Sequence, residues 1–306
     1  MNTPLFVRRP LPASMAYVVA VDGGGTSTRA RVWRRSGQLV GEGRAGASGL
    51  IQGCAQAWLN IGLAIDHAMS TRIGSGWPQP SPSNTAIALG LAGANNPDWA
   101  ELLLQTNPGY VHIDLHSDAL TALHGAHGGR AGALVIVGTG SVGMALETDG
   151  TLRSVGGWGF PGGDEGSGAD LGLQALRLTQ QAMDGRIAPS LLTDLVGAHV
   201  GGDPDSLLDW CCRATQNTYA SCAPMVFAAA PTDARAQRLI TRAVYHLSAM
   251  VSTLDPHKTL PVVVSGSVGQ RLIPRLHKAL FQRVRPAQGD AMQGAAQLLL
   301  HRLGCD

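Results

Sequence analysis

An acidic residue, three glycines and three hydroxyl residues follow the first apolar run of the chain. After Asp22 the segment runs through Gly23, Gly24, Gly25, Thr26, Ser27 and Thr28. Glycines let a ligand approach the backbone closely, and exposed amides form an anion-binding concavity, so the segment suits phosphate oxygens. Residues 28–34 alternate like a strand and no Gly-Lys-Ser/Thr follows, which excludes a Walker loop. An ordinary glycine-rich hairpin with an acid at its mouth is the simpler alternative.

The second half of the chain repeats this order of elements. Residues 133–137 predict an apolar strand, residues 142–147 a returning strand, and between them lie Gly138, Thr139, Gly140 and Ser141. A polar turn and a third strand follow, as they do after the first hairpin. Two such hairpins on separate domains could face each other and hold one polyphosphate between them.

One carboxylate lies in sequence between the two turns. Asp118 follows a predicted strand at 110–114 and begins a predicted helix. An aspartate at such a junction can cap the helix by accepting hydrogen bonds from backbone amides. It can also act as a general base that accepts a proton from a substrate hydroxyl. Taken alone, the position favours the cap.

The composition limits the classes to which the chain can belong. A chain of 306 residues can form two domains, and a net charge of +2 without a Lys/Arg run argues against a nucleic-acid binder. The apolar run at 15–21 is too short to span a membrane. Residues 1–14 lack a signal-peptide core and predict a flexible tail. The five cysteines form no Cys-x-x-Cys pair, which favours a reducing, cytoplasmic setting.

Strands and helices alternate along much of the chain. Buried strands are predicted at 85–91 and 260–264, and residues 187–257 are mostly helical in pattern. An apolar helix at 290–303 closes the chain. This alternation indicates an α/β protein built in layers.

These motifs, with two further segments, resemble the sugar kinase/actin/heat-shock-chaperone ATPase superfamily. In the expected order, the motifs are a phosphate turn at 22–29, a catalytic segment at 117–119, a second phosphate turn at 137–143, a sugar-pocket signature at 157–167 and an adenosine turn at 262–269. Within the superfamily, the chain is similar to the BadF/BadG/BcrA/BcrD ATPase-like branch. That branch contains N-acetylglucosamine kinases, bacterial glucosamine kinases and activators of 2-hydroxyacyl-CoA dehydratases.

The resemblance implies an α/β fold of two ribonuclease-H-like (actin-like ATPase) domains. Each would be a mixed five-stranded sheet flanked by helices, with ATP in the interdomain cleft and closure by hinge motion. We expect the N-terminal domain at 15–124, the C-terminal domain at 125–287, and a last helix at 288–306 that packs back on the first domain. The branch is commonly dimeric, so a homodimer is expected.

The resemblance also implies which residues bind ATP and its metal. The phosphates would be bound by Gly24, Gly25, Thr26, Ser27, Thr28, Gly138, Thr139, Gly140 and Ser141. Gly266 and Ser267 would flank the adenosine, although a plain strand-to-helix turn is nearly as plausible there. Asp22 would hold Mg2+ through water, because magnesium dehydrates reluctantly.

The same resemblance assigns a sugar site. Asp118 would contact the sugar as general base, Trp158 would offer an apolar face to the ring, and Asp164 would accept hydrogen bonds from hydroxyls. Alternatively, Trp158 fills the core, and Asp164 and Glu165 cap the next helix; the role of Glu165 stays open. Bacterial relatives usually carry an asparagine near residue 48, where Ser48 is the candidate here.

These assignments predict ATP-dependent phosphorylation of the 6-hydroxyl of an amino sugar, with N-acetylglucosamine favoured and glucosamine as the alternative. An ATP-driven activator of a 2-hydroxyacyl-CoA dehydratase is the rival of another class. Such activators hold an iron–sulfur cluster through cysteines beside glycine turns, and none of the five cysteines lies in those turns here. A sugar-responsive regulator is a third alternative, disfavoured by the presence of Asp118.

Overall fold

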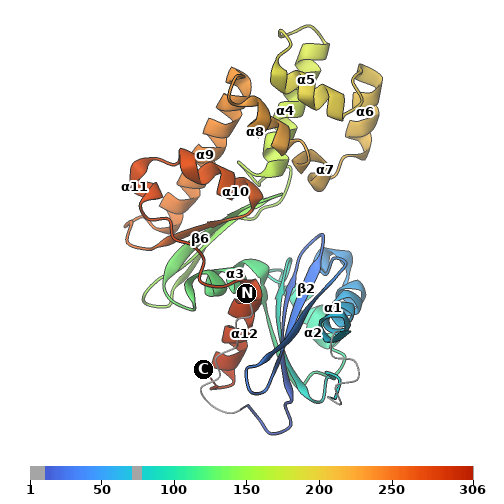
Figure 1. Cartoon of the computed structure of the whole chain (residues 1–306), viewed down its shortest axis with the longest axis vertical. Coiled ribbons are helices and arrows are strands. Elements are labelled where there is room, and N and C mark those ends of the chain that lie inside the picture. Colours follow the sequence, from blue (N-terminus) through green and yellow to red (C-terminus); the bar gives the residue numbers. More distant parts are fainter. Residues whose placement is uncertain (1–10, 71–77, 306) are drawn as a thin grey trace. The chain divides into compact units, whose positions relative to one another are not determined.

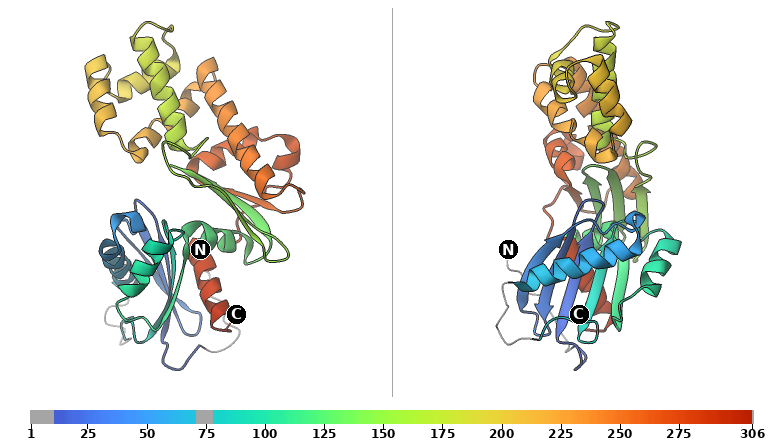
Figure 2. Two further views of the ribbon diagram at one scale, coloured as in Figure 1. Left: turned by 180° about the vertical axis from the view of Figure 1, so that it is seen from behind. Right: turned by 90° about the vertical axis from the view of Figure 1, so that its right-hand side faces the viewer.

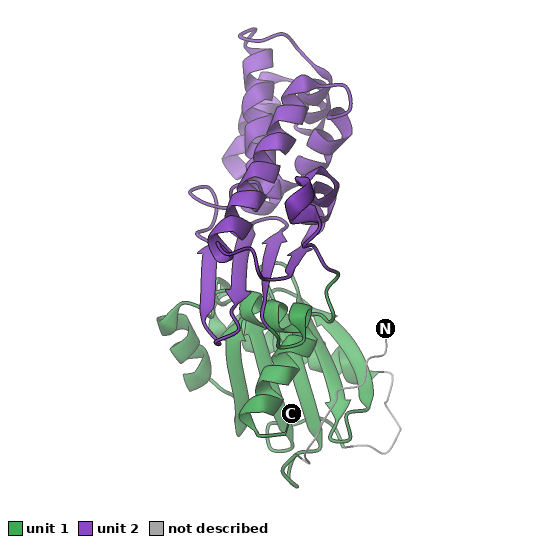
Figure 3. Ribbon diagram, turned by 90° about the vertical axis from the view of Figure 1, so that its left-hand side faces the viewer, with its two compact units in different colours: residues 1–130, 286–306 green, residues 131–285 purple. Residues whose placement is uncertain are grey.

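The computed structural model describes residues 11–70 and 78–305, which form two compact units (Figure 1). The first unit comprises residues 1–130 and 286–306, and the second comprises residues 131–285 (Figure 3). The first unit is therefore assembled from two segments that are far apart in the sequence, whereas the second unit is continuous.

Five strands form the sheet of the first unit. They are β1 (Tyr17–Gly23), β2 (Thr28–Arg34), β3 (Leu39–Ala45), β4 (Thr85–Leu91) and β5 (His112–Ser117). Their order across the sheet is β3-β2-β1-β4-β5. The first three strands form an antiparallel meander, whereas β4 and β5 extend the sheet parallel to β1. The carboxyl ends of β1, β4 and β5 therefore lie at one edge of the sheet.

Helices cover both faces of this sheet (Figure 2). They are α1 (Cys54–Met69), α2 (Pro97–Gln105), α3 (Asp118–His127), α12 (Ala291–Arg302) and the short 3-10 helix η1 (Leu50–Gln52). Along β1, Val19 and Val21 pack into the core with α1, whereas Val18 and Ala20 pack into the core with α12. This alternation arises because successive side chains of a strand point to opposite faces, and both faces are buried here.

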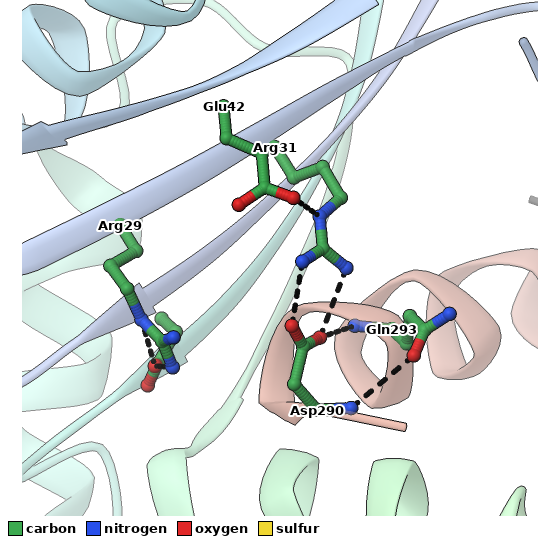
Figure 4. Close-up of polar contacts among 6 residues, drawn as sticks. Arg29, Arg31, Glu42, Asp290 and Gln293 are labelled. Atoms are coloured by element: carbon green, nitrogen blue, oxygen red, sulfur yellow. Dashed lines mark hydrogen bonds and ion pairs between the residues drawn. The ribbon is translucent and has the colours of Figure 1, made fainter. Parts of the chain in front are cut away.

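The last helix is joined to the rest of the first unit by charged side chains and by close backbone contact. Asp290 at the N-terminus of α12 accepts hydrogen bonds from both Nη atoms of Arg31, at 3.1 and 2.6 Å (Figure 4). Glu42 accepts a hydrogen bond from Nε of Arg31 at 2.8 Å. A Cβ on Gly294 would lie 1.9 Å from the carbonyl oxygen of Thr121. Only glycine therefore lets α12 approach α3 this closely.

The observed division of the chain differs from the expected one at both ends of the second unit, which ends at residue 285 and not 287, and at the N-terminus. The first unit continues to residue 130, beyond the expected boundary after residue 124, because α3 extends to His127 and ends at the left-handed Gly128. Residues 1–10 of the expected flexible tail (1–14) lie outside the described residues. Leu11 is 2% exposed and packs into the core with α12, so the chain is already anchored there.

The sheet of the second unit has four strands. They are β6 (Gly132–Val137), β7 (Ser141–Leu146), β8 (Leu152–Gly156) and β9 (Val262–Ser265), in the order β8-β7-β6-β9. The first three form an antiparallel meander like that of β1 to β3, and β9 is parallel to β6. The fifth strand expected from the resemblance is reduced to a single parallel bridge between Val262 and Val284. Within the described residues, the prediction of five strands is therefore wrong for this unit.

The second unit is rich in helices. They are α4 (Gly168–Met183), α5 (Leu191–His199), α6 (Pro204–Arg213), α7 (Gln216–Ala220), α8 (Ala223–Ala229), α9 (Ala234–Leu254), α10 (Ser267–Leu272), η3 (Ile273–Arg275) and α11 (Lys278–Phe281). In α9, Ile240, Ala243 and Leu247 recur at helical spacing and are buried, which is the stripe expected of a helix that packs on a core. No helix within the described residues is long and apolar enough to cross a membrane.

Candidate active site

The first glycine turn connects β1 to β2 and is tied to the loop that follows β3. The amide of Gly24 donates to the carbonyl oxygen of Ser27 at 3.0 Å, which closes the turn. The carbonyl oxygen of Gly24 accepts hydrogen bonds from the amides of Ser48 and Gly49, at 3.2 and 3.0 Å. Residues 25–27 are exposed. The turn is therefore held from one side, while the amides and hydroxyls of residues 25–27 remain accessible.

Two hydroxyls that were predicted to contact ligands are instead buried beneath this turn. Thr28 and Ser48 are 0% exposed, and their hydroxyl oxygens lie 2.7 Å apart. The Thr28 hydroxyl also donates to the carbonyl oxygen of Gly46 at 2.5 Å. A Cβ on Gly23 would lie 2.0 Å from Oγ of Ser48, so Ser48 packs directly under the turn. The predicted contacts of Thr28 with phosphate and of Ser48 with sugar are thus corrected, because both hydroxyls brace the turn from within.

Two glycines of the turns have no role inside the protein that requires glycine. A Cβ added to Gly25 or to Gly138 would meet no atom within 4 Å, and neither residue has a positive φ. The fold would therefore accept a side chain at both positions. Glycine at both positions leaves the backbone open to close approach by a ligand.

Asp22 and Arg29 form an ion pair across the hairpin, next to the first turn. They are cross-strand partners on β1 and β2. Oδ2 of Asp22 accepts hydrogen bonds from Nε and Nη2 of Arg29, at 3.1 and 2.5 Å (Figure 4). Among the residues that the structure describes, nothing donates a hydrogen bond to Oδ1 of Asp22, so this oxygen can bind a further group.

This arrangement fits one kind of magnesium site. Within residues 11–70 and 78–305, no group of three or more His, Cys, Asp or Glu side chains could hold a metal ion. Mg2+ commonly keeps several waters and binds through one or two carboxylates together with substrate phosphates. Oδ1 of Asp22, beside the exposed turn, fits such water-mediated binding, whereas a cage made by protein alone does not fit.

Asp118 lies at the same sheet edge as the first turn. It is the first residue of α3, directly after β5, and the parallel register aligns Asp22 on β1 with Gly90 on β4 and His116 on β5. Ser117 is the N-cap of α3, and its hydroxyl accepts a hydrogen bond from the helix backbone at 3.2 Å. The capping role that was the alternative for Asp118 therefore belongs to Ser117.

The surroundings of Asp118 favour proton acceptance. Burial raises the pKa of this carboxyl above its ordinary value, and the charge of nearby Asp22 raises it further. A hydrogen bond from the Ala119 amide to Oδ1, at 2.8 Å, opposes these effects. A carboxylate with a raised pKa binds a proton more readily, and catalytic bases are tuned in this way.

The second glycine turn connects β6 to β7 and is braced by a buried carboxylate. The amide of Gly138 donates to the carbonyl oxygen of Gly140 at 2.9 Å. Asp164 is 5% exposed; its Oδ1 accepts a hydrogen bond from the Ser141 amide at 2.9 Å, and its Oδ2 accepts one from Nε2 of Gln216 at 2.7 Å. Both carboxylate oxygens thus accept a hydrogen bond within the protein, and this side chain positions the turn. A carboxylate oxygen can accept more than one hydrogen bond, so the contact of Asp164 with sugar stays a prediction.

Some polar groups of the second turn form hydrogen bonds within the protein, and others are exposed to solvent. The hydroxyl of Ser141 donates to the carbonyl oxygen of Glu165 at 3.0 Å and is therefore used within the protein. Thr139 is exposed and Gly140 is partly exposed. The backbone of Asp164 has a φ of 61°, in the left-handed region, which aspartate adopts more readily than most residues. The groups that this turn can offer to phosphate are the amides of Thr139 and Gly140 and the Thr139 hydroxyl.

The loop between β8 and α4 presents an aromatic side chain to solvent. Trp158 is 87% exposed, so the alternative that it fills the core is wrong. Capping of α4 by the side chains of Asp164 and Glu165 is also wrong, because Ser167 is the N-cap and its Oγ accepts a hydrogen bond from the Asp170 amide at 3.2 Å. The Glu165 side chain is exposed. Contact of Trp158 with a sugar ring stays a prediction.

A cavity adjoins both the second turn and the predicted adenosine turn. Gly266 has a φ of 86°, and a Cβ there would lie 2.2 Å from the carbonyl oxygen of Val137, so this position requires glycine. Ser267 is exposed and begins α10. The cavity has a volume of about 180 Å3, and its lining includes Gly138, Thr139, Ala223, Phe227, Ser267 and Arg271.

The two largest side chains of this lining, those of Phe227 and Arg271, are absent from the sequence-based prediction. Arg271 lies four residues after Ser267 on α10, about one helical turn away, so helical spacing could have indicated it. Phe227 lies on α8, 44 residues before Arg271 in the sequence (271 − 227), and only the folded unit brings the two together.

Comparisons with known proteins place these units among solved folds. A protein from Chromobacterium violaceum, described as a candidate N-acetylglucosamine kinase, is 42% identical, with a TM-score of 0.89 over 94% of this chain and 99% of that chain. Glucosamine kinase GspK of Vibrio cholerae is 34% identical over 283 residues, which cover 92% of this chain and 95% of that protein. A ROK family glucokinase from Streptomyces griseus, 16% identical with a TM-score of 0.54 over 92% of this chain, shares the fold alone.

The two mixed sheets, each with a glycine turn after its first strand, define an ATPase of the ribonuclease-H-like, actin-like class, which confirms the predicted fold class. Residues 19–285 match the model of the BadF/BadG/BcrA/BcrD ATPase family, and the chain belongs to this family. The family predicted from the motifs is thereby confirmed.

Proposed function

We propose that this protein is an ATP-dependent kinase that transfers the γ-phosphoryl group of ATP to the 6-hydroxyl of an amino sugar, with N-acetylglucosamine as the preferred acceptor. The observation that carries the proposal is the position of Asp118. Its half-buried carboxyl has a raised pKa and lies at the same sheet edge as the first glycine turn. The similarity to amino-sugar kinases along nearly the whole chain supports the choice of acceptor.

In the first unit, the first turn binds phosphate and Asp118 accepts the proton. The amides and hydroxyls of residues 25–27 donate hydrogen bonds to phosphate oxygens, which offsets the charge that must move during transfer. Asp118 accepts the proton of the sugar hydroxyl as that oxygen attacks phosphorus. Mg2+, when bound through Asp22, supplies charge neutralisation for the phosphates. Arg29 holds Oδ2 of Asp22 and thereby fixes the direction of Oδ1.

The second unit contributes ATP contacts and a platform for the sugar. The amides of Thr139 and Gly140 and the hydroxyl of Thr139 bind phosphate, Gly138 lets the phosphate approach the backbone, and Gly266 and Ser267 flank the adenosine. Trp158 offers its exposed indole to the apolar face of a sugar ring. Asp164 supports the second turn, and its oxygens retain the capacity to accept a hydrogen bond from a sugar hydroxyl as well.

Glucosamine is the second candidate acceptor. It is favoured by the 34% identity to the Vibrio cholerae glucosamine kinase. The two acceptors differ in the group on the 2-nitrogen, which is an acetamide in one and a charged amine in the other. The ratio of kcat/KM for the two sugars therefore decides between them.

ADP release measured with a panel of hexoses and hexosamines tests the proposed function. We expect turnover with N-acetylglucosamine and none with its 6-deoxy analogue, which lacks the accepting hydroxyl. Faster turnover of glucosamine would reverse the order of the two acceptors. Absence of turnover with every sugar would overturn the kinase proposal.

We also propose that the protein acts in the cytoplasm, which its cysteine pattern favours, and that it forms a homodimer, as the resemblance to its branch implies. Light scattering after size-exclusion chromatography tests the second point. The expected mass is twice that of the 31.8 kDa chain, and a mass equal to that of one chain contradicts the proposal.

A further inference from the structure

The cavity beside the second turn carries an arginine without an acidic partner. Arg271 lines this cavity, and its guanidinium carbon lies 5.1 Å from the centroid of the Phe227 ring. Within the part of the chain that the structure describes, the Arg271 side chain forms no ion pair and no hydrogen bond. One face of the guanidinium lies over the Phe227 ring, so its charge and its other face are available to a ligand.

We propose that Phe227 and Arg271 form the wall that contacts the base of the nucleotide, and that this wall selects purines by stacking and not by hydrogen bonds to the edge of the base. The inference deepens the proposed function, since it concerns the nucleotide that donates the phosphoryl group. It names two residues and a basis of selectivity that the sequence motifs do not contain.

The position of the cavity supports its occupation by the base. Gly138 and Thr139 of the second turn line one part of it, and Ser267 lines another. A nucleotide whose phosphates contact the second turn therefore extends its nucleoside toward this space. Small residues at Gly168 and Ala223 form further lining, which leaves room for a flat ring.

The chemistry of the lining supports stacking. A guanidinium is planar and stacks on aromatic rings, and a nucleobase offers such a face whatever groups its edge carries. The Phe227 ring lies beneath the Arg271 guanidinium and supports its plane from the protein side. A purine covers more of this wall than a pyrimidine does, because it has two fused rings.

The same lining offers little that could distinguish adenine from guanine. Among the described residues that line the cavity, none has a carboxylate or amide side chain. The carbonyl oxygens of Gly138 and Thr139 already accept hydrogen bonds from the amides of Gly168 and Ala169, at 2.8 and 3.0 Å. The hydroxyls of Thr139 and Ser267 can either donate or accept, so they suit both purines.

Binding of the two halves of the nucleotide, measured separately, tests the position of the wall. NMR titrations with adenosine and with inorganic triphosphate are compared for the wild type, Arg271→Ala, Arg271→Lys and Arg275→Ala. Arg275 is a matched control, because its guanidinium carbon lies 6.0 Å from the centroid of the Phe227 ring and Arg275 does not line the cavity. We expect Arg271→Ala to weaken adenosine binding about fivefold to tenfold and to leave triphosphate binding unchanged. Arg271→Lys should behave like Arg271→Ala for adenosine, because lysine keeps the charge but loses the plane.

Two results of this experiment would overturn the proposal. One is weaker binding of triphosphate with unchanged binding of adenosine in Arg271→Ala, which would place the guanidinium on the phosphates. The other is equal loss of adenosine binding in Arg275→Ala. Thermal unfolding of each variant shows whether the fold is retained, and Phe227→Leu provides an independent variant of the same wall.

A panel of phosphoryl donors tests the selectivity. With one accepted sugar, we expect kcat/KM for GTP within about tenfold of that for ATP, and clearly lower values for CTP and UTP. A preference for ATP over GTP of about a hundredfold or more would indicate hydrogen-bond readout of the base edge and overturn the proposal. Loss of turnover with every sugar and every donor would count against the proposed function, while the adenosine titrations would still decide the position of the wall.

Discussion

The two glycine turns share a sequence pattern but are held in place by different chemistry. Beneath the first turn lie two neutral hydroxyls, of Thr28 and Ser48, 2.7 Å apart. Beneath the second lies the carboxylate of Asp164, which accepts a hydrogen bond from the Ser141 amide at 2.9 Å. One turn is therefore braced by uncharged groups and the other by a charge.

The acids around each turn give a physical reason for this difference. The first turn stands beside Asp22, and Asp118 lies at the same sheet edge with its pKa already raised. A third carboxylate there would add repulsion, whereas buried hydroxyls add none. Residues 137–143 of the second turn contain no acid, so a carboxylate can serve as its brace. Turns of similar sequence can thus be held by neutral or by charged side chains, depending on the acids that already lie near them.

The largest expected effect follows replacement of Asp118, the proposed general base. Asp118→Asn should lower kcat by about 10²- to 10⁴-fold, because an amide cannot accept the proton of the sugar hydroxyl. Binding of ATP should be retained. Asp98→Asn, an exposed aspartate at the start of α2, is the control. Steady-state kinetics and calorimetric titration with ATP measure the two effects, and near-normal turnover would exclude Asp118 as the base.

The raised pKa of Asp118 makes a second prediction about the same group. A base works only when deprotonated, so kcat/KM for the sugar should fall as pH decreases through the pKa of Asp118. Since burial and then Asp22 raise this pKa, the fall should begin at a higher pH than for an ordinary aspartate. A pH–rate profile at saturating ATP measures it. An acid limb within the ordinary aspartate range would contradict the assignment.

The charged brace of the second turn should matter for stability and for ATP. Asp164→Ala leaves the Ser141 amide without its acceptor in a buried site, which should destabilise the fold by about 1–3 kcal/mol and weaken ATP binding. Asp164→Asn keeps an acceptor oxygen and tolerates the left-handed backbone, so its effects should be smaller. Thermal unfolding and the KM values for ATP and sugar test this. A rise in the sugar KM alone would show that Asp164 serves the sugar site and not the ATP turn.

Adding a methyl group to each turn compares the two phosphate sites directly. Gly25→Ala and Gly138→Ala should leave thermal stability nearly unchanged, because their Cβ atoms meet no protein atom within 4 Å. Each should raise the KM for ATP by an amount equivalent to about 1–2 kcal/mol, since the methyl group crowds a phosphate. Gly62→Ala on α1, where a Cβ likewise meets open space, is the matched control. Unchanged KM values for both turn variants would show that neither glycine lies against the nucleotide.

Removal of one hydroxyl from the Thr28–Ser48 pair should give the smallest effect. Ser48→Ala removes a hydroxyl under the first turn while Thr28 keeps its hydrogen bond to the Gly46 carbonyl oxygen. The free energy of unfolding should fall by about 0.5–1.5 kcal/mol, and the KM for ATP should rise slightly. Chemical unfolding and the ratio of kcat/KM for N-acetylglucosamine and glucosamine are the measurements. A changed ratio would mean that Ser48 contacts the acceptor after all.

Much of the fold and part of the site could be predicted from local patterns. The apolar runs before Asp22 and Gly138 locate strands, and the glycines after them locate turns, because both signals extend over only a few neighbouring residues. The position of Asp118 is also given by a local signal, because the residue lies between a predicted strand and a predicted helix. The reduction of the fifth strand in the second unit to a bridge at Val262 and Val284 left no comparable local signal.

The amino-acid sequence by itself determined where the two turns and Asp118 lie, since each is encoded by neighbouring residues. Only the tertiary structure decided which polar side chains are exposed and which form hydrogen bonds inside the protein. Ser48 meets Thr28 across 20 residues, and Asp164 meets Ser141 across 23. Serine and aspartate suit a buried brace as well as an exposed contact, and the difference lies in partners that only folding brings within hydrogen-bond distance.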